Sequence, residues 1–128
     1  MADGRNSLVP RGPLGVWKAF IWSVQGLIAA FRLESSFRLE VLLFLIAAPL
    51  GYWLGESAIE RVMLIGCLLP VMAAELLNSS IEALIERYGN ERHEWAGLAK
   101  DMGSAAVFLL MMNVLICWGL ILLPRLAG

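Results

Sequence analysis

The chain has 128 residues, of which 59% are hydrophobic and 16% charged, and its mean hydropathy is +0.73. The apolar share is well above that of ordinary globular domains, so the composition indicates a membrane protein. The net charge of −1 leaves no basic surplus, which argues against nucleic acid as a partner.

The N-terminal stretch is set apart from the rest by the segment SLVPRG, Ser7 to Gly12. This segment is typical of a thrombin-cleavable linker added for expression. Residues 1–12 are therefore interpreted as a tag remnant, and residues 13–128 as one integral-membrane domain. The leader has no apolar core followed by a small-residue cleavage site, so no removable signal peptide is expected.

Residues of about 14–34 predict an amphipathic helix. Apolar residues recur here at spacings of three and four, with Lys18, Gln25 and Arg32 among them and with two tryptophans, Trp17 and Trp22. Such a pattern is typical of a helix that lies in the membrane interface rather than crossing it. A packing helix on a soluble domain is the alternative interpretation.

Three apolar segments follow, at about 37–54, 59–86 and 102–123. Only the third is free of charges, and it alone passes unaided the length test of about 20 apolar residues for a spanning helix. The first two cross the membrane only if they tolerate charges near one end. The sequence thus predicts an all-α membrane protein with one surface helix and three transmembrane helices. Cys67 and Cys117 lie inside apolar runs and are expected to be buried free thiols.

The basic residues near the spans predict the orientation in the membrane. More of them lie before the first span and between the second and third than on the other side. The first group holds six residues, Lys18, Arg32, Arg38, Arg87, Arg92 and Lys100, and the other side holds two, Arg61 and Arg125. Because basic residues favour the cytoplasmic side, we expect a cytoplasmic N-terminus and a C-terminus outside.

The second predicted span carries carboxylates before its apolar run has ended, in PVMAAELLNSSIEALIER. Counted from Arg61 at about 1.5 Å per residue, Glu75 lies about 21 Å deep, still within hydrocarbon, and Glu82 lies about 31 Å deep, at its edge. Four polar residues share the helix face of Glu75 to within about 60°: Asn78, Ser79, Glu82 and Glu86. This face has no basic residue, so its carboxylates require a divalent metal, a protonated Glu75, or both. A span that simply ends at Ala74 is the alternative.

The segment YGNERHEWAGLAKDMGSAAV is charged, and its composition favours a solvated cytoplasmic loop. Lys100 and Asp101 adjoin the third span, and small neighbours there allow close helix approach: Ala99, Gly103, Ser104 and Ala105. A lysine beside a carboxylate cluster at the membrane surface suits phosphate. The sequence contains neither a P-loop nor a protein-kinase glycine loop. If phosphoryl groups bind here, metal ions and Lys or Arg side chains would have to offset their negative charge. His93, the one histidine, is interpreted as a surface residue.

Three motifs, LESSFRLE, ELLNSSIEALIER and AKDMGSAAV, resemble in this order the bacterial integral-membrane diacylglycerol kinase family. The resemblance covers about Trp17 to Trp118. It implies a homotrimer in the bacterial inner membrane, with active sites shared between neighbouring subunits. It also implies transfer of the ATP γ-phosphate to the hydroxyl of diacylglycerol, which forms phosphatidic acid and requires Mg²⁺.

The same resemblance implies roles for individual residues. Glu75 matches the family's general base, Asn78 is its neighbour in the site, and Lys100 offsets phosphate charge. Glu34 and Glu82 match the metal-binding carboxylates. The residues implied for ATP are Trp22, Glu34, Glu82, Glu91, Arg92, His93, Lys100 and Asp101. Those implied for the lipid are Glu40, Arg61, Glu75, Ser104 and Trp118. Two departures are Gly15, where better-known members have an arginine, and Trp22, where they share a tyrosine.

Two other functions stay open at this point. An undecaprenol kinase has a similar plan but a polyprenyl alcohol as acceptor. A small oligomeric cation channel or transport subunit, with Glu75 and Glu82 lining a central pathway, belongs to another class.

Overall fold

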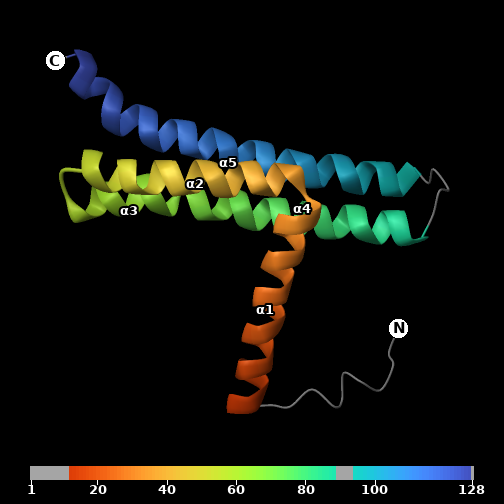
Figure 1. Cartoon of the computed structure of the whole chain (residues 1–128). Coiled ribbons are helices and arrows are strands. Elements are labelled where there is room, and N and C mark those ends of the chain that lie inside the picture. Colours follow the sequence, from red (N-terminus) through yellow and green to blue (C-terminus); the bar gives the residue numbers. More distant parts are fainter. Residues whose placement is uncertain (1–11, 89–93, 128) are drawn as a thin grey trace.

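A computed structural model describes residues 12–88 and 94–127, and all of the regular structure in these two ranges is helical. The helices are α1 (Pro13–Leu33), α2 (Ser35–Leu54), α3 (Ala58–Gly66), α4 (Leu68–Tyr88) and α5 (Glu94–Ala127). α3 and α4 follow one another along a common line, α5 runs antiparallel beside α4, and α2 packs against both α3 and α4 (Figure 1). α1 leaves this bundle at a steep angle. The predicted all-α architecture is confirmed.

The corner between α1 and α2 lies at Glu34, whose backbone is extended with φ −112° and ψ 112°. Arg38 from the first turns of α2 reaches back, and its Nη1 donates to the carbonyl oxygens of Phe31 at 2.9 Å and Arg32 at 3.0 Å. Carbonyls in the last turn of a helix lack partners within the helix, so this contact satisfies them. The corner is therefore held by a side chain of the helix that follows it.

The predicted span 59–86 is not one helix, because it breaks at Cys67 between α3 and α4. Pro70 explains the break. It has no N–H to donate, and its ring conflicts with the carbonyl of Gly66 four residues earlier. The two helices still form one stretch, Ala58–Arg87, that is long and apolar enough to cross a membrane, so the predicted span is divided but not displaced.

α5 begins at Glu94, well before the predicted start at residue 102. The expected loop is thus helical from residue 94, and the prediction of a loop over 94–101 is wrong. Glu94 in the first turn complements the positive end of the helix dipole, which favours this earlier start. Lys100 and Asp101 are exposed on the first turns of α5. Residues 89–93 and the predicted tag residues 1–11 lie outside the described ranges.

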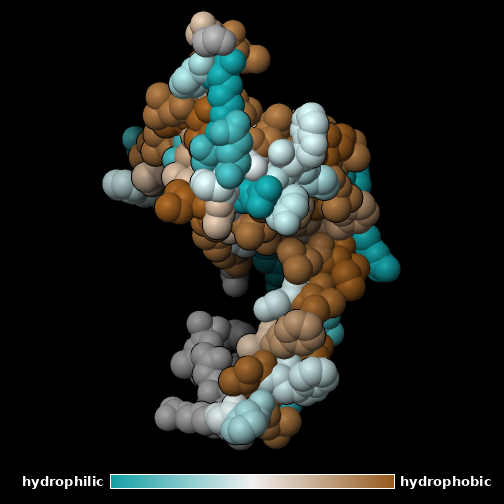
Figure 2. All heavy atoms as spheres, turned by 90° about the vertical axis from the view of Figure 1, so that its left-hand side faces the viewer, coloured by the Kyte–Doolittle hydropathy of each residue, from teal (hydrophilic) through white to brown (hydrophobic). Residues whose placement is uncertain are grey.

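The surface of the bundle is mainly apolar. Large side chains on several helices are exposed, among them Trp53 at 77%, Leu120 at 74% and Leu45 at 63%. Figure 2 shows hydrophobic atoms over much of the visible face. A soluble monomer rarely exposes so much contiguous apolar surface. Four stretches of the described chain are long and apolar enough to cross a membrane: Pro13–Leu33, Ser35–Leu54, Ala58–Arg87 and Glu94–Ala127. The membrane character is confirmed, whereas an interfacial position for α1 stays a prediction.

The buried core of the described chain is small, and its apolar members are Phe37, Leu64, Cys67, Val71, Ala74, Val107 and Cys117. Leu64 is fully buried, and its carbonyl oxygen accepts from Trp118 Nε1 at 3.0 Å, which joins α3 to α5. Gly51 allows α2 to pack closely on α3 at this point, because a Cβ at position 51 would come within 3.1 Å of Leu64 Cβ. Cys67 and Cys117 are both free and buried, as predicted.

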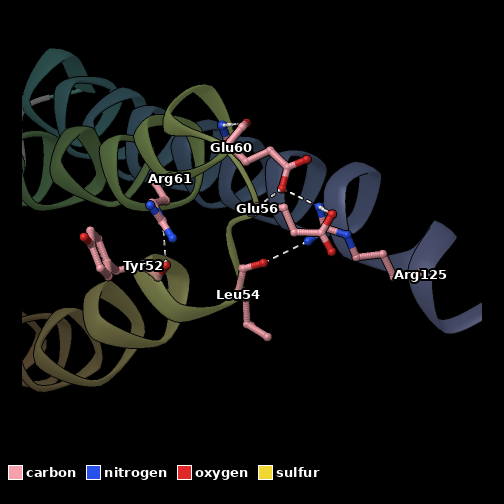
Figure 3. Close-up of polar contacts among 7 residues, drawn as sticks. Tyr52, Leu54, Glu56, Glu60, Arg61 and Arg125 are labelled. Atoms are coloured by element: carbon pink, nitrogen blue, oxygen red, sulfur yellow. Dashed lines mark hydrogen bonds and ion pairs between the residues drawn. The ribbon is translucent and has the colours of Figure 1, made fainter.

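Arg125 ties the end of α5 to the connection between α2 and α3 (Figure 3). Its Nη1 donates to the Leu54 carbonyl oxygen at 2.9 Å, and its Nη2 pairs with Glu60 and, at 3.3 Å, with Glu56. Glu60 is held in turn, because its Oε1 accepts from the Glu56 N–H at 3.0 Å. One guanidinium therefore satisfies a helix-end carbonyl and two carboxylates. We call these four residues the Arg125 clasp.

Replacing Arg125 by methionine should lower the thermal unfolding midpoint in detergent by a few degrees, because the Leu54 carbonyl then loses its side-chain donor and Glu60 loses its ion pair. Glu56→Gln is the matched control. Its side chain is 72% exposed, so losing that ion pair should change the midpoint much less. Equal midpoints for the two variants would show that the clasp contributes nothing beyond surface charge.

Candidate active site

Three polar or charged side chains are buried in the described part of the chain: Glu40, Glu75 and Asn78, at 9%, 9% and 7% exposure. Glu40 comes from α2, and the other two come from α4. On the opposite side of α4, Leu77 and Leu84 are 67% and 60% exposed. The polar face predicted from periodicity therefore points into the bundle, and the apolar face points outward. The burial of Glu75 and Asn78 argues against the alternative of a solvated helix end beyond Ala74.

Glu40 and Glu75 are close enough for their carboxyl groups to interact. Glu40 Oε1 is buried and has no hydrogen-bond partner. Two carboxylates in contact within an apolar bundle repel one another when both are ionised, so the pair needs a proton or a cation. The residue patterns alone did not predict this pair, since Glu40 entered only through the family resemblance. The available signal was a carboxylate inside the apolar run of the first span.

Asn78 lies about one helical turn from Glu75 on the same face of α4. Its Nδ2 donates to Glu82 Oε1 at 3.3 Å, whereas its buried Oδ1 has no partner. Gly103 on α5 lies against this side chain, because a Cβ there would come within 2.3 Å of Asn78 Oδ1. The predicted close approach of helices at small residues is confirmed at Gly103. Only glycine leaves room for Asn78 in this orientation.

Lys100 lies near the level of Glu82 along the bundle. Because α4 and α5 are antiparallel and Asn78 lies against Gly103, Glu82 and Lys100 are each displaced by about one turn toward the same end. Glu82 is half-buried, and Lys100 is exposed. The polar residues therefore range from the buried carboxyl groups of Glu40 and Glu75 to the exposed ammonium group of Lys100. Ser104 is exposed and adjoins Gly103.

Glu34 lines a groove of about 550 Å³ between α1 and α4, with Ser79 and Ser80 on the facing helix. No three His, Cys, Asp or Glu side chains in the described ranges lie close enough to hold a metal ion by themselves. Mg²⁺ commonly uses only one or two carboxylates and completes its shell with water and substrate phosphates. Carboxylate oxygens are ligands of the kind that Mg²⁺ takes, but Glu82 is not among the residues that line this groove, so Glu34 and Glu82 stay predicted metal ligands.

Other residues implied by the resemblance do not meet the cluster within one chain. Trp22 is 52% exposed on α1, and Gly15 lies in the first turn of the same helix. Arg61 stacks on the Tyr52 ring, 4.4 Å from its centroid, and its Nε donates to the Tyr52 carbonyl oxygen at 2.9 Å. Trp118 lies about 21 Å from Ser104 along α5. Glu91, Arg92 and His93 lie outside the described residues.

Comparison with known proteins supplies the family. The sequence profile of the prokaryotic diacylglycerol kinase family matches residues 21–122. The chain belongs to this family. The diacylglycerol kinase of Haemophilus influenzae is 50% identical over 101 residues, covering 79% of this chain and 86% of that protein. The diacylglycerol kinase of Escherichia coli K12 is 46% identical over 105 residues, covering 82% and 86%. A Helicobacter pylori diacylglycerol kinase is 38% identical over 124 residues, covering 96% of each chain.

Family membership confirms the resemblance and the interpretation of the chain as a kinase. It does not favour the undecaprenol kinase alternative. The bacterial relatives and the four long apolar helices together support a bacterial membrane protein. The roles of single residues are not established by sequence identity, so the site residues stay predictions.

Proposed function

We propose that this chain transfers the γ-phosphate of ATP to the hydroxyl of diacylglycerol and forms phosphatidic acid. The buried cluster of Glu40, Glu75 and Asn78 carries this proposal, because carboxyl groups rarely lie inside an apolar bundle without a function. Lys100 is exposed at the same end of the bundle. A lipid alcohol can therefore approach laterally through the membrane while a nucleotide approaches from water.

In the proposed reaction, Glu75 accepts the proton of the lipid hydroxyl while the hydroxyl oxygen attacks the γ-phosphorus in line. The new P–O bond forms on the lipid, the bond to the β-phosphate oxygen breaks, and ADP leaves without a phosphoenzyme. Asn78, held between Glu82 and Gly103, positions the hydroxyl beside Glu75. Lys100 offsets the negative charge of the phosphates. Trp22, Asp101 and residues 91–93 complete the proposed nucleotide site.

The proposed metal ligands are Glu34 and Glu82, which would hold Mg²⁺ together with the phosphates of ATP. When bound, the ion would offset the charge on those phosphates. Glu82 has a second task, because its Oε1 accepts from Asn78. A glutamine at position 82 keeps an oxygen for that hydrogen bond while losing the negative charge.

Glu82→Gln should therefore raise the Mg²⁺ concentration needed for half-maximal rate at least severalfold, and Glu34→Ala should do the same. The measurement is a Mg²⁺ titration of the kinase rate at constant free ATP. Glu86→Gln is the control, because Glu86 is an exposed carboxylate on the same helix and its loss should leave the titration unchanged. Unchanged Mg²⁺ dependence in both Glu34→Ala and Glu82→Gln would refute the metal assignment.

The proposed assembly is a homotrimer in the bacterial inner membrane, with α1 at the cytoplasmic interface and the C-terminus outside. Two observations support it. The outward face of α4, with Leu77 and Leu84, is apolar and exposed in the single chain. Trp22 on α1 is exposed and does not reach the Glu75 cluster within one chain, so a neighbouring subunit would have to supply that contact.

The acceptor is tested by offering purified diacylglycerol and purified undecaprenol to the detergent-solubilised chain under identical conditions. We expect phosphorylation of diacylglycerol with a much higher kcat/KM. A preference for undecaprenol would overturn the proposed substrate. ATP-independent ion flux through liposomes with no lipid phosphorylation would favour the channel instead.

A further inference from the structure

Two thiols meet in the interior of the bundle. Cys67 lies at the break between α3 and α4, Cys117 lies in α5, and the sequence contains no other cysteine. Their side chains are close enough to interact. Cys67 lies about 14 Å into the span that begins at Ala58. Cys117 lies about 15 Å from the end of the antiparallel helix α5 at Ala127, so the two thiols are at the same level.

One backbone carbonyl holds the two cysteine-bearing segments together. The indole Nε1 of Trp118, the residue after Cys117, donates to the Leu64 carbonyl oxygen at 3.0 Å. The Cys67 thiol donates to the same oxygen at 3.4 Å. Cys67 follows the last residue of α3 and lies outside regular helix, so its backbone can adjust by the small amount that an S–S bond requires.

Both thiols are shielded from water. Cys67 is 7% exposed and Cys117 is 8% exposed, and both lie at hydrocarbon depth within their spans. Thiol–disulfide exchange proceeds through a thiolate, and a charge at this depth is costly. A charged, water-soluble oxidant such as glutathione disulfide is therefore excluded from this pair. A neutral oxidant that dissolves among the acyl chains is not excluded.

We propose that Cys67 and Cys117 are an oxidisable dithiol pair, which a membrane-soluble quinone converts to a disulfide between α5 and the break of α3 and α4. Each thiol gives up one proton and one electron, and the S–S bond forms. The quinone takes up both protons and both electrons and becomes a hydroquinone. No charged group has to enter the hydrocarbon, and none of the residues proposed for phosphoryl transfer takes part.

The disulfide would strengthen a weak point of the fold. The buried apolar core of the described chain is small, and these two cysteines are members of it. A bond that closes a loop of about 50 residues stabilises the folded chain mainly by restricting the unfolded one. Glu75 lies about 12 Å from Cys67 along α4, so the candidate active site stays in place.

The test treats the purified chain in proteoliposomes with an excess of decylubiquinone. Mass spectrometry without reductant should show a monomer that is lighter by two hydrogen atoms. Its thermal unfolding midpoint, measured after transfer to detergent, should rise by about 5–10 °C. Glutathione disulfide at the same concentration should leave both thiols free, because it does not enter the hydrocarbon.

Cys67→Ser and Cys117→Ser are the matched controls. Each removes one thiol and keeps a hydroxyl, which can donate to the Leu64 carbonyl at position 67 or to Asn113 Oδ1 at position 117. Neither variant should lose hydrogen or gain stability on treatment with the quinone.

Three results would overturn the proposal. The first is a wild-type chain whose thiols both stay free after quinone treatment. The second is a covalent dimer, which would show that the thiols react between chains rather than with one another. The third is a monomer disulfide that forms equally fast with glutathione disulfide, because the pair would then be open to water. None of these readouts depends on kinase activity.

Discussion

Replacing Glu75 by glutamine should lower the rate of diacylglycerol phosphorylation by about 100-fold to 10,000-fold, the range expected when a general base is removed. Glutamine has nearly the same shape but cannot accept the hydroxyl proton. It also relieves the contact between two carboxyl groups, because an amide beside Glu40 adds no second negative charge. We therefore expect an inactive variant whose thermal midpoint is equal to or above that of the wild type.

The combination of lost activity and retained stability is what distinguishes a catalytic role from a structural one. Glu86→Gln makes the same chemical change at an exposed position of α4 and should leave the rate nearly unchanged. Rates are measured with saturating ATP and lipid, and folding by circular dichroism and gel filtration in the same detergent. A Glu75→Gln variant that keeps more than about half of the wild-type rate would remove Glu75 as the base.

Gly103→Ala should lower kcat by about 100-fold, although it adds a single methyl group. The new Cβ would come within 2.3 Å of Asn78 Oδ1, so Asn78 must rotate and give up its hydrogen bond to Glu82. Misplacement of a positioning group by about 1 Å can cost that much in rate. Stability should change less, because alanine is favoured over glycine within a helix by about 1 kcal/mol, which offsets part of the packing cost.

Gly97→Ala is the control on the same helix. A Cβ at Gly97 meets nothing within 4 Å, so this variant should keep the wild-type rate. The two variants are compared in the same kinase assay, with kcat and KM separated. Wild-type kcat in Gly103→Ala would show that the contact between Asn78 and α5 has no part in positioning. Equal losses in both variants would point to a general effect on α5.

Helical periodicity was sufficient to predict the polar face of α4. Glu75 and Asn78 had to share a face, and burial of both follows from placing that face inside the bundle. Their partner Glu40 could not be predicted from the same pattern, because a contact between α2 and α4 depends on how two helices dock. Gly103, which leaves room for Asn78, could be recognised in the sequence only as one of several small residues near the third span.

Local backbone chemistry explains the remaining differences. Pro70 lies within an otherwise apolar run, where composition alone predicts one continuous span, yet the missing N–H divides it into α3 and α4. The Arg125 clasp joins residues from distant parts of the sequence, so its ion pairs could not be predicted. Arg125 was counted only as a charge that sets the orientation.

The most direct test of the proposed function is the chemical identity of the product formed from γ-labelled ATP and diacylglycerol by the purified chain in proteoliposomes. We predict that the label appears in phosphatidic acid, in a Mg²⁺-dependent reaction that requires both Glu75 and the lipid acceptor. Label found only in inorganic phosphate, or transferred equally well by Glu75→Gln, would contradict a site in which Glu75 activates a lipid hydroxyl.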